Sequence, residues 1–174
     1  MPTLIGIVVV LAPVGVAAVP AFVATFALDL AVLAGAWFAL RPGPPDVRAK
    51  DELRQLVHGG RPSVVELYSN YCLICMANRQ TMPLAASALG MTARFARVEL
   101  PTAAGTEIGD AYGVRYVPSY LVFDEHGDLM RTVIPDNVTP LANGYRVLDE
   151  RGQLMTRLTR VGPEDLVAMV RSVT

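Results

Sequence analysis

Two cysteines, three positions apart, constrain this chain more than any other feature of its sequence. Cys72 and Cys75 are the only cysteines among its 174 residues. An apolar run over 64–68 precedes them and predicts a buried strand, and a run over 76–89 follows them and predicts a helix. Cys72 would then lie at a helix N-terminus, where unpaired backbone N–H groups and the helix dipole lower the pKa of a thiol. Cys75, one turn deeper, is placed to close a disulfide with it.

The same spacing is half of a zinc site, and two buried structural cysteines without chemistry are a further alternative. Zinc requires four ligands, or three ligands and a water molecule. The sequence has no second cysteine pair, and its two histidines, His58 and His126, stand apart without paired ligand spacing. A redox pair is therefore the favoured interpretation, with no metal and no cofactor expected. We interpret His58 as a helix-end residue and His126 as a turn residue.

Charge is distributed very unevenly along the chain. Its formal net charge is −1, and Asp29 is the only charged side chain in residues 1–40. A balance so close to neutral provides no basic field for nucleic acid, so no nucleic-acid partner is expected. The length accommodates one ordinary domain with an appendage. Two cysteines exclude a scaffold built on several disulfides.

Residues 4–40 are almost continuously apolar and predict a membrane anchor. A spanning helix needs about 20 apolar residues. The clearest span covers 21–40, with Trp37 and Phe38 near its end, as an interfacial aromatic belt requires. Prolines and a glycine interrupt the part before it, so residues 4–19 form either a second short span or a kinked extension. A cleaved signal peptide is disfavoured because no Lys or Arg precedes the apolar run; a buried helix of a soluble protein is the remaining alternative.

The sequence gives conflicting indications of how this anchor is oriented in the membrane. Basic residues follow the span and none precedes it, so a single span would place the C-terminal domain in the cytoplasm. With two spans, the N-terminus and the domain lie on the same side. Asp29, in mid-span, is costly unless it contacts another membrane protein or lies at a shallower depth. Both readings of Asp29 remain open.

Residues 41–46 predict a stiff proline-rich linker, and residues 47–174 predict a folded domain. Asp46 is the expected N-cap of a helix over 47–58. The helices and strands then alternate, with two similar hairpins around 120–130 and 145–155 and an insertion near 135–144. The expected elements after the first helix are a strand over 64–68, a helix over 76–89, a strand over 93–100, a helix over 106–112, strands over 118–124 and 128–134, and a final helix over 166–173. This order predicts an α/β domain with helices on both faces of its sheet.

Two segments carry a family resemblance. Residues 60–75 read Gly-Arg-Pro-Ser-Val-Val-Glu-Leu-Tyr-Ser-Asn-Tyr-Cys-Leu-Ile-Cys, and residues 113–124 read Gly-Val-Arg-Tyr-Val-Pro-Ser-Tyr-Leu-Val-Phe-Asp. Their order and their separation of about 45 residues resemble the thioredoxin family. The chain is most similar to its membrane-anchored members and to the C-terminal domain of bacterial transmembrane thiol–disulfide transporters. The resemblance covers residues 47–173 and implies a thioredoxin-like fold, a central mixed sheet flanked by helices.

The resemblance implies roles for six residues. Cys72 and Cys75 match the redox-active pair, and Pro118 matches a cis-proline beside it, with the backbone of Val117 presented to an extended substrate. Tyr71 replaces the usual tryptophan and supplies a flat contact surface.

Glu66 matches a buried acid that takes the proton of the second cysteine. Burial in a strand covered on both faces would raise the pKa of this carboxyl. Alternatively, Glu66 pairs with a neighbouring cation, for which Arg97 is placed. The motif departs from the common Trp-Cys-Gly-Pro-Cys, and its residues Leu73 and Ile74 make the tip apolar.

These features predict a membrane-tethered thiol–disulfide oxidoreductase that reduces disulfides of partner proteins. Its expected partners are protein disulfides or dithiols, a membrane electron-donor protein and membrane lipid. We expect a location in a bacterial-type inner or plasma membrane. The resemblance implies that the domain lies outside the cytoplasm, although the basic residues that follow the span favour the cytoplasmic side. The alternative is a non-enzymatic accessory or assembly subunit of a membrane complex.

Overall fold

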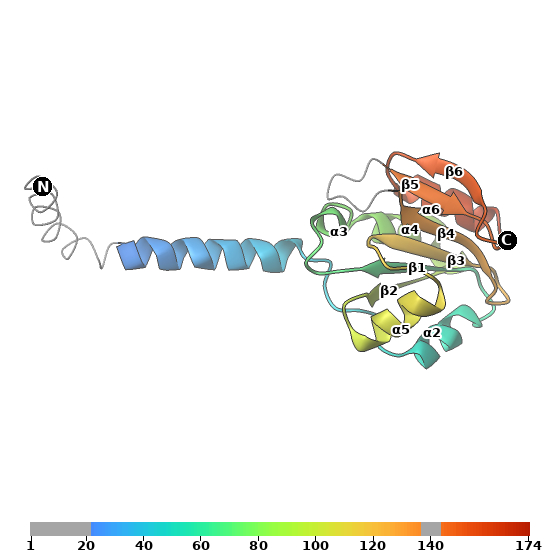
Figure 1. Ribbon diagram of the computed structural model, residues 1–174, viewed down its shortest axis with the longest axis horizontal. Coiled ribbons are helices and arrows are strands. Elements are labelled where there is room, and N and C mark those ends of the chain that lie inside the picture. Colours follow the sequence, from blue (N-terminus) through green and yellow to red (C-terminus); the bar gives the residue numbers. More distant parts are fainter. Residues whose placement is uncertain (1–21, 137–143) are drawn as a thin grey trace, which may run out of the picture. The chain divides into compact units, whose positions relative to one another are not determined.

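The computed structural model describes residues 22–136 and 144–174 and divides into two units, Met1–Leu40 and Arg41–Thr174 (Figure 1). In the first unit, helix Phe22–Leu40 has 19 residues with a mean hydropathy of 1.9 and no buried positions. It is long and apolar enough to cross a membrane, a property that signal sequences share. This helix occupies the predicted span over 21–40. The second span considered, over 4–19, lies outside the described residues.

The second unit is built on a mixed sheet. In the described residues its strands follow the order β2-β1-β3-β4-β5-β6. β1 pairs parallel with β2, and every other neighbouring pair is antiparallel. The strands are β1 (Ser63–Tyr68), β2 (Arg94–Glu99), β3 (Ser119–Phe123), β4 (Leu129–Pro135), β5 (Tyr145–Leu148) and β6 (Leu154–Leu158).

Helices cover both faces of this sheet, as predicted (Figure 1). On one face, α4 (Thr81–Leu89) and α6 (Pro163–Arg171) bury Met82 and Leu166 against alternate residues of β1, β3, β4 and β5. On the other face, α2 (Lys50–Val57) and α5 (Ala103–Ala111) pack Leu53 and Ile108 against the intervening residues of β1, β2 and β3. β1 and β3 are buried on both faces, which explains why their sequences are mostly apolar.

The single helix predicted over 76–89 is wrong. The structure has two helices there, α3 (Leu73–Ala77) and α4, separated by a turn at 78–80. Pro83 explains the break, because a proline ring inside a helix clashes with the carbonyl four residues earlier, here that of Arg79. Asn78 ends α3, and its carbonyl accepts a 2.9 Å hydrogen bond from the N–H of Thr81.

Other helix starts also differ from the prediction, including that of α6, which begins at Pro163 rather than at 166. Asp46 is not an N-cap: α2 begins only at Lys50, after Ala49, and the Asp46 carboxylate accepts a hydrogen bond from the distant Arg97 N–H. α5 begins before the predicted 106–112, because the Thr102 hydroxyl accepts a hydrogen bond from the N–H of Gly105 and caps the helix.

The two predicted hairpins are present and share their turn chemistry. In the β3–β4 turn the Asp124 carboxylate accepts hydrogen bonds from two backbone N–H groups, and Gly127 has a φ of +89°. In the β5–β6 turn Asp149 does the same, and Gly152 has a φ of +73°. Glycine suits these positions because positive φ is strained for other residues. Of the insertion expected near 135–144, residues 137–143 lie outside the described residues.

Candidate functional site

The sheet topology brings two distant segments to one edge of the domain. β1 ends at Tyr68 and leads into the cysteine loop, while β3 runs antiparallel beside it and begins at Ser119. The end of β1 therefore lies next to the start of β3. The peptide bond between Val117 and Pro118 is cis, and the Val117 carbonyl oxygen lies 3.9 Å from the sulfur of Cys72. The structure thus places the cysteine pair beside Val117 and Pro118.

Cys72 is the N-cap of α3. Its sulfur accepts a hydrogen bond of 3.2 Å from the backbone N–H of Cys75. A hydrogen bond from the Cys75 thiol lowers the pKa of Cys72 to about 6, helped by the backbone N–H groups of Cys75 and Ile74 and opposed by partial burial. A thiol with this pKa is largely ionised at neutral pH, and the thiolate is the nucleophilic form.

Cys75 has the opposite environment. It is 1% exposed, and both cysteines are free rather than joined. Its hydrogen bond to Cys72 and then its burial raise the pKa of the Cys75 thiol, to which the charge of Glu66 also contributes. The pair therefore contains one thiolate near the surface and one protonated thiol beneath it.

Glu66 lies in β1 and is 3% exposed. Burial raises the pKa of its carboxyl to about 7, although the positive charge of Arg97 and an interaction with the Tyr120 side chain lower it. Glu66 is therefore buried and the pKa of its carboxyl is raised, as predicted. A carboxyl group with a pKa near neutrality can accept and release a proton at physiological pH.

Arg97 is not the ion-pair partner of Glu66. The two residues are register partners on β1 and β2, yet the Arg97 Nε lies 3.4 Å from the Asp46 carboxylate. Another guanidinium nitrogen donates to the Pro42 carbonyl oxygen. The alternative in which Glu66 is neutralised by a direct salt bridge is wrong for this structure, in which two guanidinium nitrogens of Arg97 bind residues 42 and 46.

The surface around Cys72 is apolar. Tyr71 is 77% exposed and Leu73 is 80% exposed, and Tyr116 of the neighbouring loop is also exposed. Ile74 is only partly exposed. The apolar tip is therefore formed mainly by Tyr71 and Leu73, which flank Cys72 in the sequence, rather than by Leu73 and Ile74 as predicted.

Sequence reasoning assigned no role to two buried tyrosines near the site. Tyr120 lies opposite Glu66 in the β1–β3 register, and its hydroxyl has no well-formed hydrogen bond among the described residues. Tyr145 of β5 has its pKa raised to about 12, chiefly by burial and then by the charges of the cysteines and Glu66. Their positions follow from strand register, and the only local signal was that Tyr120 comes two residues after Pro118.

Comparisons with known proteins give fold-level likenesses only. No family model matches the chain, and no curated protein matches it. Among solved structures, a variant of thioredoxin from Halobacterium salinarum is 17% identical, covers 74% of this chain and 88% of its own, and has a TM-score of 0.47. Mitochondrial thioredoxin 3 from Saccharomyces cerevisiae is 14% identical, covers 72% of this chain and 92% of its own, and has a TM-score of 0.48.

The topology is that of a thioredoxin-like fold. A parallel β1–β2 pair and an antiparallel β3–β4 pair form the sheet, with helices on both faces. The Cys-x-x-Cys pair follows β1, and Pro118 lies directly before β3. The second unit of this chain therefore has a thioredoxin-like fold, with β5 and β6 added beyond the β3–β4 hairpin.

Proposed function

We propose that this chain is a membrane-tethered thiol–disulfide oxidoreductase that reduces disulfides of partner proteins. The observation that carries this proposal is the unequal environment of the two thiols. Cys72 has its pKa lowered to about 6 and lies at the surface, whereas Cys75 is buried and has its pKa raised. Such asymmetry suits one nucleophilic and one resolving cysteine.

The reaction proceeds in two exchanges. The Cys72 thiolate attacks a partner disulfide, forms a mixed disulfide and releases one partner thiolate. Glu66 takes the proton of Cys75, whose sulfur attacks Cys72 and releases the second partner thiolate. The partner gains two electrons and the Cys72–Cys75 pair becomes a disulfide. A dithiol from another protein must reduce this pair again, because the sequence has no further cysteine.

The substrate segment lies extended beside Val117 and Pro118 in this proposal. The Val117 carbonyl oxygen, 3.9 Å from the Cys72 sulfur, is one backbone group that such a segment can meet. Tyr71 and Leu73, which flank Cys72 in the sequence and are both strongly exposed, supply apolar contacts. Partner proteins with apolar residues around their disulfide fit this surface best.

In this proposal helix Phe22–Leu40 anchors the domain in a membrane. The protein that supplies electrons to the Cys72–Cys75 pair is itself a membrane protein. The domain lies outside the cytoplasm, and the membrane is of the bacterial inner or plasma type. Labelling of an introduced cysteine with an impermeant maleimide, in a background lacking Cys72 and Cys75, tests on which side of the membrane the domain lies. Labelling of intact cells supports the outer side, and labelling only after lysis contradicts it.

The enzymatic proposal is tested by reduction of insulin with dithiothreitol as the electron source. The wild-type chain should accelerate reduction, and Cys72→Ser should abolish the acceleration. Cys75→Ser should accumulate mixed disulfides with partner proteins, because it retains the nucleophile and lacks the resolving thiol. No rate above background, together with no trapped partner, would favour the non-enzymatic docking subunit.

A further inference from the structure

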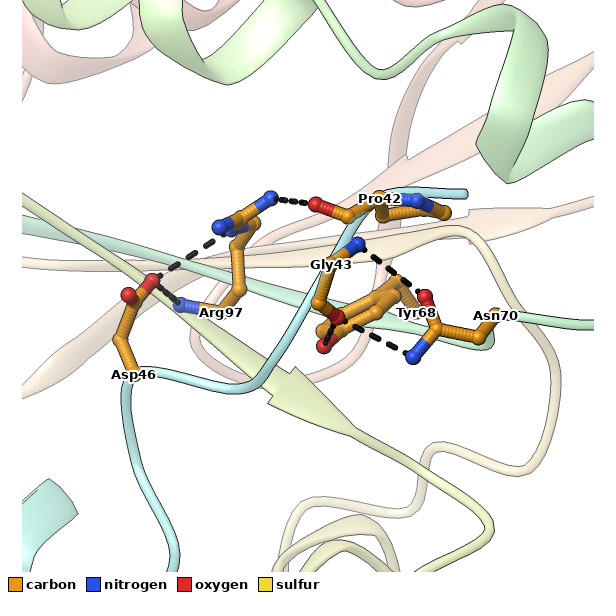
Figure 2. A network of polar contacts seen from close by, with 6 residues as sticks. All are labelled: Pro42, Gly43, Asp46, Tyr68, Asn70 and Arg97. Carbon is orange, nitrogen blue, oxygen red and sulfur yellow. Dashed lines mark hydrogen bonds and ion pairs between the residues drawn. The ribbon is translucent and has the colours of Figure 1, made fainter. Parts of the chain in front are cut away.

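The linker that follows helix Phe22–Leu40 is hydrogen-bonded to the domain next to the cysteine loop (Figure 2). We call residues 42–46 the strap. The Gly43 N–H donates a hydrogen bond of 3.1 Å to the Asn70 side-chain oxygen. The Asn70 side-chain nitrogen donates to the Gly43 carbonyl oxygen, also at 3.1 Å. The Tyr68 hydroxyl donates to the Gly43 carbonyl oxygen at 2.6 Å. The strap is therefore fixed to the residues that lead from β1 into Cys72.

Both ends of the strap bind Arg97. The Asp46 carboxylate accepts a hydrogen bond of 2.9 Å from the Arg97 backbone N–H and lies 3.4 Å from its Nε. The Asp46 N–H in turn donates to the Arg97 carbonyl oxygen at 2.9 Å. The Pro42 carbonyl oxygen accepts from the guanidinium, as Figure 2 shows. The strap thus binds both the backbone and the side chain of this residue.

Arg97 would have an obvious second partner without the strap. Arg97 and Glu66 are adjacent in register on parallel strands, and such neighbours project to the same side of a sheet. Arg97 has donors in a fixed fork that suits a carboxylate. The strap engages two guanidinium nitrogens of Arg97 through Pro42 and Asp46, and no ion pair joins Arg97 and Glu66 in the described structure.

We propose that Asp46 is a positioning residue of the redox site, which acts by holding the Arg97 guanidinium away from Glu66. This inference rests on the proposed role of Glu66 as the base for Cys75. With the strap in place, Glu66 keeps a carboxyl that exchanges protons near neutral pH. Without Asp46, the guanidinium turns toward Glu66, keeps the carboxylate ionised and makes it a weaker base.

Several other groups face Glu66 and must stay constant in a test. Arg97 and Asp46 act on it from β2 and the strap. The remaining titratable groups that interact with Glu66 are Tyr68 on β1, Tyr120 on β3, Tyr145 on β5, and Cys72 and Cys75 at α3. Comparisons within the reduced full-length chain keep all of them unchanged.

The test is a titration of Glu66 by carboxyl ¹³C NMR, in the reduced full-length chain in detergent micelles. Glu66→Gln identifies the resonance. Asp46→Asn keeps an oxygen that can accept from the Arg97 N–H and removes the charge. It should lower the pKa of Glu66 by about half a pH unit or more, whereas Arg97→Gln should raise it. Asp51→Asn, which removes a more exposed charge in α2, should leave it unchanged.

The double variant separates positioning from simple charge. If Asp46 acts through Arg97, Asp46→Asn should have little effect in an Arg97→Gln background. An equal shift in both backgrounds, or no shift in either, would overturn the inference. Insulin reduction by the wild type and by Cys72→Ser reports separately on the proposed function. A wild-type chain with no activity above that of Cys72→Ser would contradict the proposed function while leaving the titration interpretable.

Discussion

The backbone N–H of Cys75 lies 3.2 Å from the sulfur of Cys72, and the Cys75 thiol donates to that same sulfur. The thiol hydrogen bond is the largest cause of the lowered pKa of Cys72. Cys75→Ala removes this donor and keeps the backbone N–H. We expect the pKa of Cys72 to rise, with alkylation by iodoacetamide at pH 6.5 slowed by about tenfold.

Cys75→Ser is the matched control for this measurement, because its hydroxyl is also a donor. The pH dependence of its alkylation rate should give a lower pKa for Cys72 than the pH dependence measured for Cys75→Ala. Both variants leave Cys72 as the only thiol, so the rates refer to one sulfur. Identical pH profiles for the two variants would show that the side-chain donor does not control the acidity of Cys72.

The raised pKa of Glu66 has a consequence for stability. Its pKa is about 7 in the folded chain and about 4.5 in the unfolded chain. The folded state therefore holds its proton over a wider range, and this stabilisation is complete below pH 4.5 and is lost as the pH rises through 7. A difference of this size corresponds to about 3 kcal/mol.

Urea unfolding of the oxidised full-length chain, in which neither thiol titrates, measures this effect. Between pH 4.5 and pH 8.5 the wild type should lose about 3 kcal/mol of unfolding free energy relative to Glu66→Gln. Glu107→Gln, at an exposed position in α5, should follow the wild type. Parallel curves for the wild type and Glu66→Gln would mean that this carboxyl titrates normally.

The exposed side chain of Leu73 should govern reaction with proteins rather than with small molecules. Leu73→Ser removes apolar surface beside Cys72 without touching the core, since Leu73 is 80% exposed. We expect kcat/KM for a protein disulfide to fall severalfold. The rate with a small disulfide such as hydroxyethyl disulfide should stay the same.

Leu84→Ser is the control, because Leu84 is also exposed but lies on α4. It should leave both rates unchanged. A drop in the small-disulfide rate for Leu73→Ser would instead indicate that the change alters the chemistry of Cys72 itself.

Gly105 should be intolerant of any side chain. A Cβ at this position would collide with the carbonyl of Glu99, where α5 crosses the end of β2. Gly105→Ala should therefore cost about 2–3 kcal/mol of unfolding free energy, as overpacking does elsewhere. Ala103→Gly, on the exposed first turn of α5, should cost less than about 1 kcal/mol. Equal losses for the two variants in thermal unfolding would contradict this packing argument.

Local sequence pattern predicted the strands well and the helix starts less well. β1, expected over 64–68, spans Ser63–Tyr68, because a strand buried on both faces is a mostly apolar run with clear ends. The break between α3 and α4 was missed because the effect of Pro83 falls on Arg79, four residues earlier.

The chemistry of the site was predictable only where it is local. Cys72, Cys75 and Glu66 stand within ten residues of each other, and their environments follow from one strand and one helix start. Asp46 was misassigned because a polar residue before a helix has two possible uses, a cap or a long-range contact. The strap and the position of Tyr120 depend on strand register, which joins residues about 50 positions apart.

The anchorage of Gly43 and Asp46 decides where soluble expression fragments of this protein should start. A truncation at Val47 would strip the acceptors from the Tyr68 hydroxyl and the Arg97 guanidinium, together with one partner of Asn70. Fragments that begin at Arg41 retain these contacts. Redox measurements on shorter fragments would describe a different molecule from the one in the cell.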